Sequence, residues 1–134
     1  AIELRDGTII TGSNSPTMHA ASSLVLKAIK NLAEIPGRLD LLPANIIESI
    51  RDFKTEVLGE KSVSLDLEET LVSLSISAIS NPAAKLALEK IRELKGCDVH
   101  MTHIPTPGDE AGLRRLGVNV TSDPNFSTNN LFIA

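Results

Sequence analysis

The side chains with most capacity for chemistry follow two short strand patterns late in the chain. Residues 97–104 lie between Gly96 and Pro105 and have the composition and bounds of a strand. A second alternating run begins at Val118, after a short helical pattern over residues 110–116. Two strands joined by such a helix form a parallel pair with a right-handed crossover. The polar residues that follow both strands therefore meet at one edge of a sheet.

In open parallel sheets, ligands bind beyond the carboxyl ends of the strands, where loops vary and helix N-termini point inward. We expect any small-molecule site on this edge. Polar residues near the N-terminus join it if the second strand of an N-terminal hairpin runs in the same direction. The same residue types are also ordinary in turns and helix caps. The candidate site residues are Ser13, Asn14, Ser15, His100, Thr102, His103, Thr106, Asp109, Thr121, Ser122, Asp123 and Asn125.

Cys97, His100 and His103 have the spacing of a metal-binding motif. On a strand, however, Cys97 and His103 face one way and His100 the other, so we expect no metal site there. Cys97 with His103 as a general base is excluded too, because six residues of extended chain separate them by about 20 Å. A pairing of Cys97 with His19 stays open. Our main expectation is that Cys97 is a buried structural thiol.

The segment from Gly12 to Thr17 ends a strand with small polar residues and opens a helix. Free amides at a helix N-terminus bind anions. The segment lacks the glycine pattern of a phosphate-binding or dinucleotide-binding loop, so it identifies no cofactor. Ser15 as the helix N-cap, with Pro16 as the first helical residue, would explain the same residues without a ligand.

Composition limits the class of protein. A chain of 134 residues is long enough for one domain, and with 2% aromatic residues its core must be aliphatic. A net charge of -4 argues against a nucleic-acid partner, which needs clustered lysine and arginine. A single cysteine fits a reducing, cytoplasmic compartment, and no apolar run is long enough to cross a membrane.

The rest of the pattern predicts a mixed α/β fold. Asp6-Gly7 between alternating runs predicts an N-terminal hairpin. Four helices are expected between the hairpin and residue 97. They cover residues 16–32, 44–58, 67–80, where Asp66 and Glu69 form a capping box, and the stretch from Pro82 that Gly96 closes. The helix over 67–80 is apolar nearly all round, which is typical of the centre of a fold or of a surface that faces a partner.

Residues 1–134 are therefore expected to form a single α/β domain. The chain begins without Met, inside a strand pattern. We interpret it as the C-terminal fragment of a longer protein.

Several stretches of the sequence resemble a bacterial family of unknown function, domain of unknown function 1846, in its C-terminal part. The resemblance covers essentially the whole chain. It rests on Asp6-Gly7-Thr8, Thr11-Gly12, Ser15-Pro16, Ala21-Ser22-Ser23, residues 74–78, Asn81-Pro82, residues 86–89, residues 94–97 with His100, residues 115–119 and Thr121.

The resemblance implies a three-layer α/β unit with the shape of the cytidine deaminase fold, at the end of a chain several times longer. Some family members are labelled ATP-dependent peptidases. Two departures bear on shared chemistry. The family pattern has Ser-Thr where this chain has Met101-Thr102, and it has Thr-Cys-Glu-Pro at residues 121–124, where this chain has Thr-Ser-Asp-Pro.

Two functional interpretations follow. The first is a C-terminal packing or oligomerisation domain of a larger bacterial protein, because the sequence contains a helix that is apolar all round and lacks a convincing catalytic constellation. Its partners would be the rest of the parent chain and further copies of itself. The second is part of an enzyme, a hydrolase or a nucleotide-dependent enzyme, whose active site is completed by the N-terminal region. Fold class alone does not decide between them.

Overall fold

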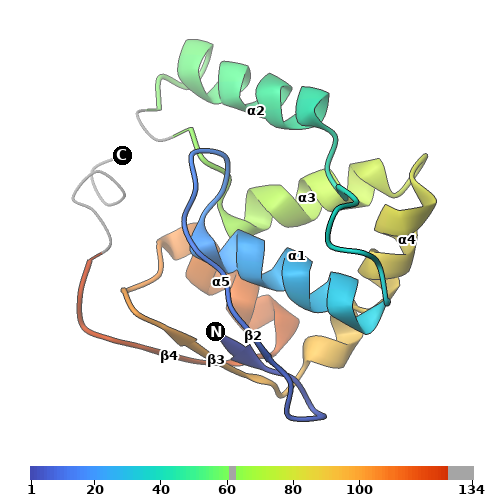
Figure 1. Ribbon diagram of the computed structural model, residues 1–134. Coiled ribbons are helices and arrows are strands. Elements are labelled where there is room, and N and C mark those ends of the chain that lie inside the picture. The colour runs from blue at the N-terminus through green and yellow to red at the C-terminus, as the bar shows by residue number, and fades with distance from the viewer. Residues whose placement is uncertain (61–62, 127–134) are drawn as a thin grey trace.

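The computed structural model describes residues 1–60 and 63–126 as a mixed α/β fold (Figure 1). A small four-stranded sheet is accompanied by helices, as the sequence predicts. The elements in this part of the chain are β1 (Ile2–Glu3), β2 (Ile9–Ile10), α1 (Ala20–Leu32), α2 (Ala44–Glu56), α3 (Leu67–Ser77), α4 (Pro82–Glu89), the 3-10 turn η1 (Ile91–Leu94), β3 (Asp98–Met101), α5 (Pro107–Leu116) and β4 (Asn119–Ser122).

The sheet has the strand order β2-β1-β3-β4. β1 is antiparallel to both of its neighbours, and β3 and β4 are the expected parallel pair joined through α5. Because β1 is antiparallel to both β2 and β3, β2 runs in the same direction as β3 and β4. The residues that follow β2 therefore lie at the same edge of the sheet as those that follow β3 and β4.

Helices of the described chain cover only one face of the sheet. Ile2, Val99 and Met101 point to the helices and are buried, whereas Glu3 and His100 are exposed on the other face. α1 and α5 pack against the sheet, and α3 and α2 lie above them, so the order of the three layers is sheet, helices, helices (Figure 1). The likeness to the cytidine deaminase shape remains a prediction.

The core is aliphatic, as the shortage of aromatic residues requires. It lies between the covered face of the sheet and the helices above it. The largest fully buried aliphatic side chains are Ile2, Val25, Ile29, Leu65, Leu67, Leu74, Leu94, Val99 and Leu113.

Helix α1 begins at Ala20, and the prediction that Ser15 caps it and Pro16 opens it is wrong. Met18 forms a β-bridge with Leu65, in which the Leu65 amide donates to Thr17 O at 2.9 Å and the His19 amide donates to Leu65 O at 2.8 Å. Residues held in this bridge cannot be helical. The Ala20 amide donates instead to the Asn14 side chain at 2.7 Å.

Helix α5 also departs from its expected start. It begins at Pro107 rather than Glu110, with the Thr106 hydroxyl accepting from the Asp109 amide at 3.3 Å. Proline suits the first position of a helix because it has no amide hydrogen to satisfy. The residues just before the predicted helix are therefore its first turn, and Asp109 lies in it.

Helix α3 ends at Ser77 rather than Ser80, and its predicted capping box is present. It buries Leu67, Thr70, Ser73, Leu74 and Ser77, and the Ser73 and Ser77 hydroxyls donate to backbone carbonyls at 2.7 Å. The apolar residues of its other side are exposed. Because apolar residues or serines lie on every face of this helix, its sequence allows any face to be buried, and the tertiary contacts decide which one is buried.

Replacing Leu74 by Ala should destabilise the fold by about 2–5 kcal/mol, since Leu74 is fully buried and the truncation leaves a cavity. Chemical denaturation measures this loss as a change in the free energy of unfolding. The matched control is Val72→Ala, one position on the exposed side of the same helix, which should cost much less. A loss below about 1 kcal/mol for Leu74→Ala would contradict the assignment of α3 to the core.

Candidate functional site

The residues expected at the sheet edge separate into two groups in the structure. Three of them meet on the surface at the ends of β3 and β4. Thr106 and Asp109 turn away from this edge into the interior, where they meet residues from two other helices. Of the remaining ones, Ser122 is the last residue of β4 and the others lie in the loops after β2, β3 and β4.

His100, Thr121 and Asp123 form the surface group. His100 is paired with Thr121 across the parallel strands, and Asp123 follows β4 directly. The Nδ1 atom of His100 lies 2.7 Å from Thr121 Oγ1, and its Nε2 atom lies 3.2 Å from Asp123 Oδ1. About half of each of the His100 and Asp123 side chains is exposed. Such a trio can hold a hydroxyl next to a proton acceptor, which is the arrangement needed to polarise that hydroxyl.

His100 and Thr121 border a shallow hollow on the uncovered face of the sheet. The hollow has a volume of about 480 Å³, which is enough for a small polar molecule or for side chains of another segment. Its lining combines polar and apolar side chains, and among the latter Ile9 is the large exposed one. The hollow is lined by Ala1, Ile2, Glu3, Ile9, Asp98, Val99, His100, Asn119 and Thr121.

Thr102 and His103 border a second, smaller hollow of about 80 Å³ beside Gly12. A side chain at Gly12 would collide with the backbone of α1, since its Cβ would lie 2.7 Å from the Leu24 amide nitrogen. The close contact between this loop and α1 explains the glycine without a ligand. The Asn14 side chain accepts from the Ala20 amide at 2.7 Å, and Ser15 Oγ accepts from the Met18 amide at 3.2 Å in the turn before α1, so Ser15 stabilises this turn but is not the helix N-cap.

Asp109 is the centre of the buried group, and only 1% of its surface is exposed. Its Oδ1 atom accepts a hydrogen bond from the Leu67 amide at 2.9 Å, and its Oδ2 atom lies 2.9 Å from Nδ1 of His19. Because Leu67 opens α3, His19 precedes α1 and Asp109 lies in the first turn of α5, the N-termini of three helices converge on one carboxylate.

Asp66 brings a second carboxylate to this group. Its side chain caps α3 and lies against Gly108, where a Cβ atom would be only 2.2 Å from Asp66 Oδ2. Burial raises the pKa of Asp66. Burial alone would lower the pKa of His19, but the hydrogen bond and charge of Asp109, together with the charge of Asp66, raise it.

The other ring nitrogen of His19, Nε2, is buried and has no hydrogen-bond partner among residues 1–60 and 63–126. A carboxylate on Nδ1 with Nε2 unpaired is the geometry of an oriented general base. In this domain the pair joins the residue before α1 to the first turn of α5. From the sequence, His19 was a candidate only as a general base for Cys97. The capping box at Asp66 and the short spacing from Thr106 to Asp109 were the signals that could have indicated this meeting of helix ends.

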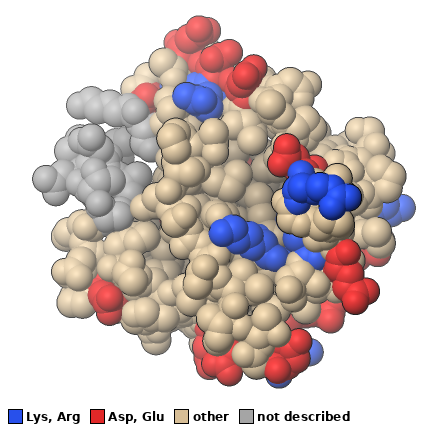
Figure 2. Space-filling model, in the orientation of Figure 1, with Lys and Arg blue, Asp and Glu red and all other residues tan. Residues whose placement is uncertain are grey.

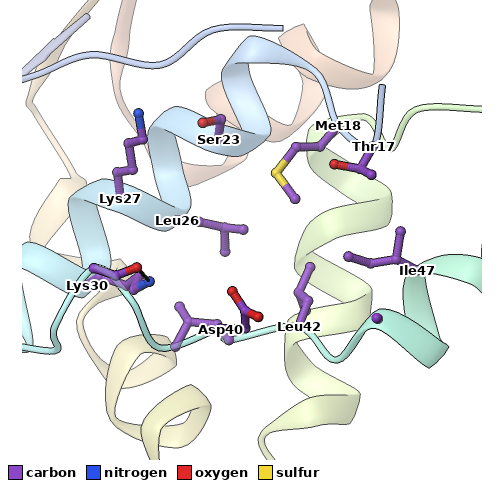
Figure 3. Close-up of a pocket in the computed structure, with 12 residues that line it drawn as sticks. Thr17, Met18, Ser23, Leu26, Lys27, Lys30, Asp40, Leu42 and Ile47 are labelled. Carbon is purple, nitrogen blue, oxygen red and sulfur yellow. Dashed lines mark hydrogen bonds between the residues drawn. The ribbon is translucent and has the colours of Figure 1, made fainter. Parts of the chain in front are cut away.

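A third hollow, of about 340 Å³, lies between α1 and the segment that leads into α2 (Figure 3). It contains none of the residues proposed for the sheet edge. Met18, Leu26 and Leu42 point into it, and Asp40 lies at its lower side in the view. α2 packs loosely beside it, with Lys54 as its only fully buried residue.

Cys97 is buried, as expected, and burial raises the pKa of its thiol. Its sulfur lies 3.7 Å from Glu93 O rather than beside a histidine. In the described part of the chain, no three His, Cys, Asp or Glu side chains are grouped closely enough to hold a metal ion. On the face drawn in Figure 2, lysine and arginine form small separate groups rather than a continuous basic surface.

The small mixed sheet, covered by helices on one face, defines a domain of the α/β class. The chain belongs to the family described as "Domain of unknown function DUF1846, C-terminal", which matches residues 1–132. The family resemblance of the sequence is thereby confirmed.

Relatives of the chain are UPF0371 proteins of clostridia. Those of Clostridioides difficile (strain 630) and Clostridium botulinum (strain Alaska E43 / Type E3) are 45% and 44% identical to it over 132 residues. That of Clostridium tetani (strain Massachusetts / E88) is 40% identical over 132 residues. Each match covers 98% of this chain but 26% of the relative, so the chain corresponds to the C-terminal part of a larger protein. Among the described residues, no helix is long and apolar enough to cross a membrane.

The raised pKa of His19 predicts how stability depends on pH. The stabilisation is complete below the pKa of an unfolded histidine and is lost as the pH rises through the higher pKa of the folded state. The free energy of unfolding should therefore decrease as the pH rises between about pH 5 and about pH 9, and this decrease should be absent in His19→Asn. His103→Asn, at a histidine without an ion pair among the described residues, is the control. Equal pH dependence in wild type and His19→Asn would contradict this assignment.

Proposed function

We propose that this chain is the C-terminal packing domain of a larger protein, and that the rest of the parent chain covers the open face of its sheet. The observation that carries the proposal is this face itself. Parallel strand pairs are usually buried on both faces, and here one face of the β3–β4 pair is exposed.

The position of Ala1 supports this occupant. In a C-terminal domain, the preceding region joins the chain at its first residue. The Ala1 amino group donates to His100 O at 2.8 Å, and Ala1 lines the hollow of the open face. The preceding region would therefore begin beside the surface that it covers.

Accessibility of Ile9 tests the proposal. Ile9 is 57% exposed and lines the hollow, so a thiol reagent should react quickly with Ile9→Cys in the isolated chain. In the parent-length protein the reaction should be at least about tenfold slower, because a covered residue reacts only when the interface opens.

The matched control is Val57→Cys at the end of α2, where the side chain is 66% exposed. It should react equally fast in both proteins. The buried Cys97 provides only a slow background in each. Equal rates for Ile9→Cys in the two proteins, at any protein concentration, would contradict packing on this face.

A second candidate function is a shared active site at the same interface. It is favoured by His100, which uses both ring nitrogens in contacts to Thr121 and Asp123 and borders the hollow. A preceding region that covers the hollow would exclude water and could supply the missing groups.

For this second function, the parent-length protein would be assayed with activated esters, phosphate esters, peptides and nucleoside triphosphates. Any activity found should fall by at least about a hundredfold in His100→Ala, if His100 transfers a proton in the reaction. Thr102→Ala, at a neighbouring exposed residue, should leave it nearly unchanged. Full activity of His100→Ala would exclude this role.

A further inference from the structure

Strand β1 keeps its hydrogen bonds as far as the first residue of the chain. The Ala1 nitrogen donates to His100 O at 2.8 Å, and the His100 amide donates to Ala1 O at 2.9 Å. Two residues that exchange both hydrogen bonds occupy a paired position of an antiparallel ladder. Ala1 therefore continues the register in which Ile2 pairs with Val99.

This register defines where a residue that precedes Ala1 would lie. One step back from the pair that Ala1 forms, the corresponding residue of β3 is Met101. On the other side of β1, the pairing of Ile2 with Ile10 leads by the same count to Gly12. The position before Ala1 therefore falls between Met101 and Gly12.

The smaller hollow described above, of about 80 Å³, lies at this position. It exceeds the space of one water molecule, which is roughly 30 Å³, so it has room for a small side chain. Residues of both neighbouring segments and of α1 border it, among them Ala1, Gly12, Met101, Ala20, Ala21 and Leu24.

The alternation of side chains along β1 sets the direction in which this side chain would point. Ile2 is buried towards the helices, and Glu3 is exposed on the open face. The residue before Ala1 shares the face of Ile2, so its side chain points to the alanines and the leucine of α1. A polar side chain would lose its water there without gaining a partner, so the hollow suits an apolar one.

We propose that the residue before Ala1 in the parent-length protein continues β1 and fills this hollow with an apolar side chain. Such a residue exists there, because the chain corresponds to the C-terminal part of relatives of which it covers 26%. Its Cα atom lies about 3.8 Å from that of Ala1, so neither a distant segment nor a second copy can take this place.

The surroundings of the Ala1 nitrogen support this arrangement. Burial lowers the pKa of the Ala1 amino group, because partial exclusion of water disfavours the charged form. In the longer chain the same nitrogen is an uncharged amide, which avoids this cost and still donates to His100 O.

This inference goes beyond the packing role proposed above, because it concerns the side of the sheet that faces the helices and not the open face. Thr102 and His103 border the same hollow. The incoming chain would therefore form one wall of the edge at which these two candidate site residues lie.

A single cysteine at the position before Ala1 tests the burial of this side chain. The parent-length protein is used, with Cys97 and any further cysteine replaced by Ala. A thiol reagent should modify the new cysteine at least about tenfold more slowly than Val57→Cys, which is 66% exposed in this chain, because a buried thiol reacts only when the strand opens. Equal rates would overturn the proposal.

A cross-strand disulfide tests the register. The position before Ala1 and Met101 would form a non-hydrogen-bonded antiparallel pair, whose Cα atoms lie about 4.5 Å apart, within the range that a disulfide spans. Under mild oxidation, the new cysteine should therefore form a disulfide with Met101→Cys, which mass spectrometry of a digest detects. It should form none with His100→Cys, whose side chain lies on the other face.

A disulfide with His100→Cys, or none with Met101→Cys in a folded variant, would overturn the proposed register. If Met101→Cys does not fold, the modification rate of the single cysteine decides the question. These results are independent of the proposed packing of the parent chain, since protection of Ile9→Cys reports on the open face in either case.

Discussion

The carboxylate of Asp109 holds together the N-terminal ends of three helices, and the arrangement of the layers depends on it. It accepts from the Leu67 amide at the start of α3 and pairs with His19 at the start of α1, while its own residue lies in α5. Burying a carboxylate is costly unless it is paired and hydrogen-bonded, and removing one partner leaves an uncompensated charge. Since α1 and α5 pack on the sheet, this pairing also fixes the position of α3 above them.

The domain presents two outward surfaces of opposite character. The open face of the sheet contains the polar group of His100, Thr121 and Asp123, whereas the outer side of α3 exposes the apolar side chains of Val72 and Ile76. Both belong to elements whose other side is buried in the core. A polar face beside a small hollow suits a contact in which water and side chains are shared, and an apolar helix stripe suits close helix packing.

Local signals predicted much of the fold. The Asp6-Gly7 turn and the capping box at Asp66 act over a few residues, so a single stretch of sequence contains all that they require. The parallel pair also followed from local pattern, because the length of the helix between its strands leaves few alternatives. By contrast, Ser15 is a good cap by type, yet the helix begins only at Ala20, because Met18 is paired with Leu65 in a β-bridge.

The sequence by itself determined the fold class, the aliphatic core, the family and the group of polar residues at the ends of β3 and β4. Only the tertiary structure decided which side of α3 is buried, because apolar residues and serines alternate round that helix and local pattern favours no side. It likewise decided that Asp109 pairs with His19. Ninety positions separate these two residues, and a contact over that distance arises only when the helices that carry them are packed together.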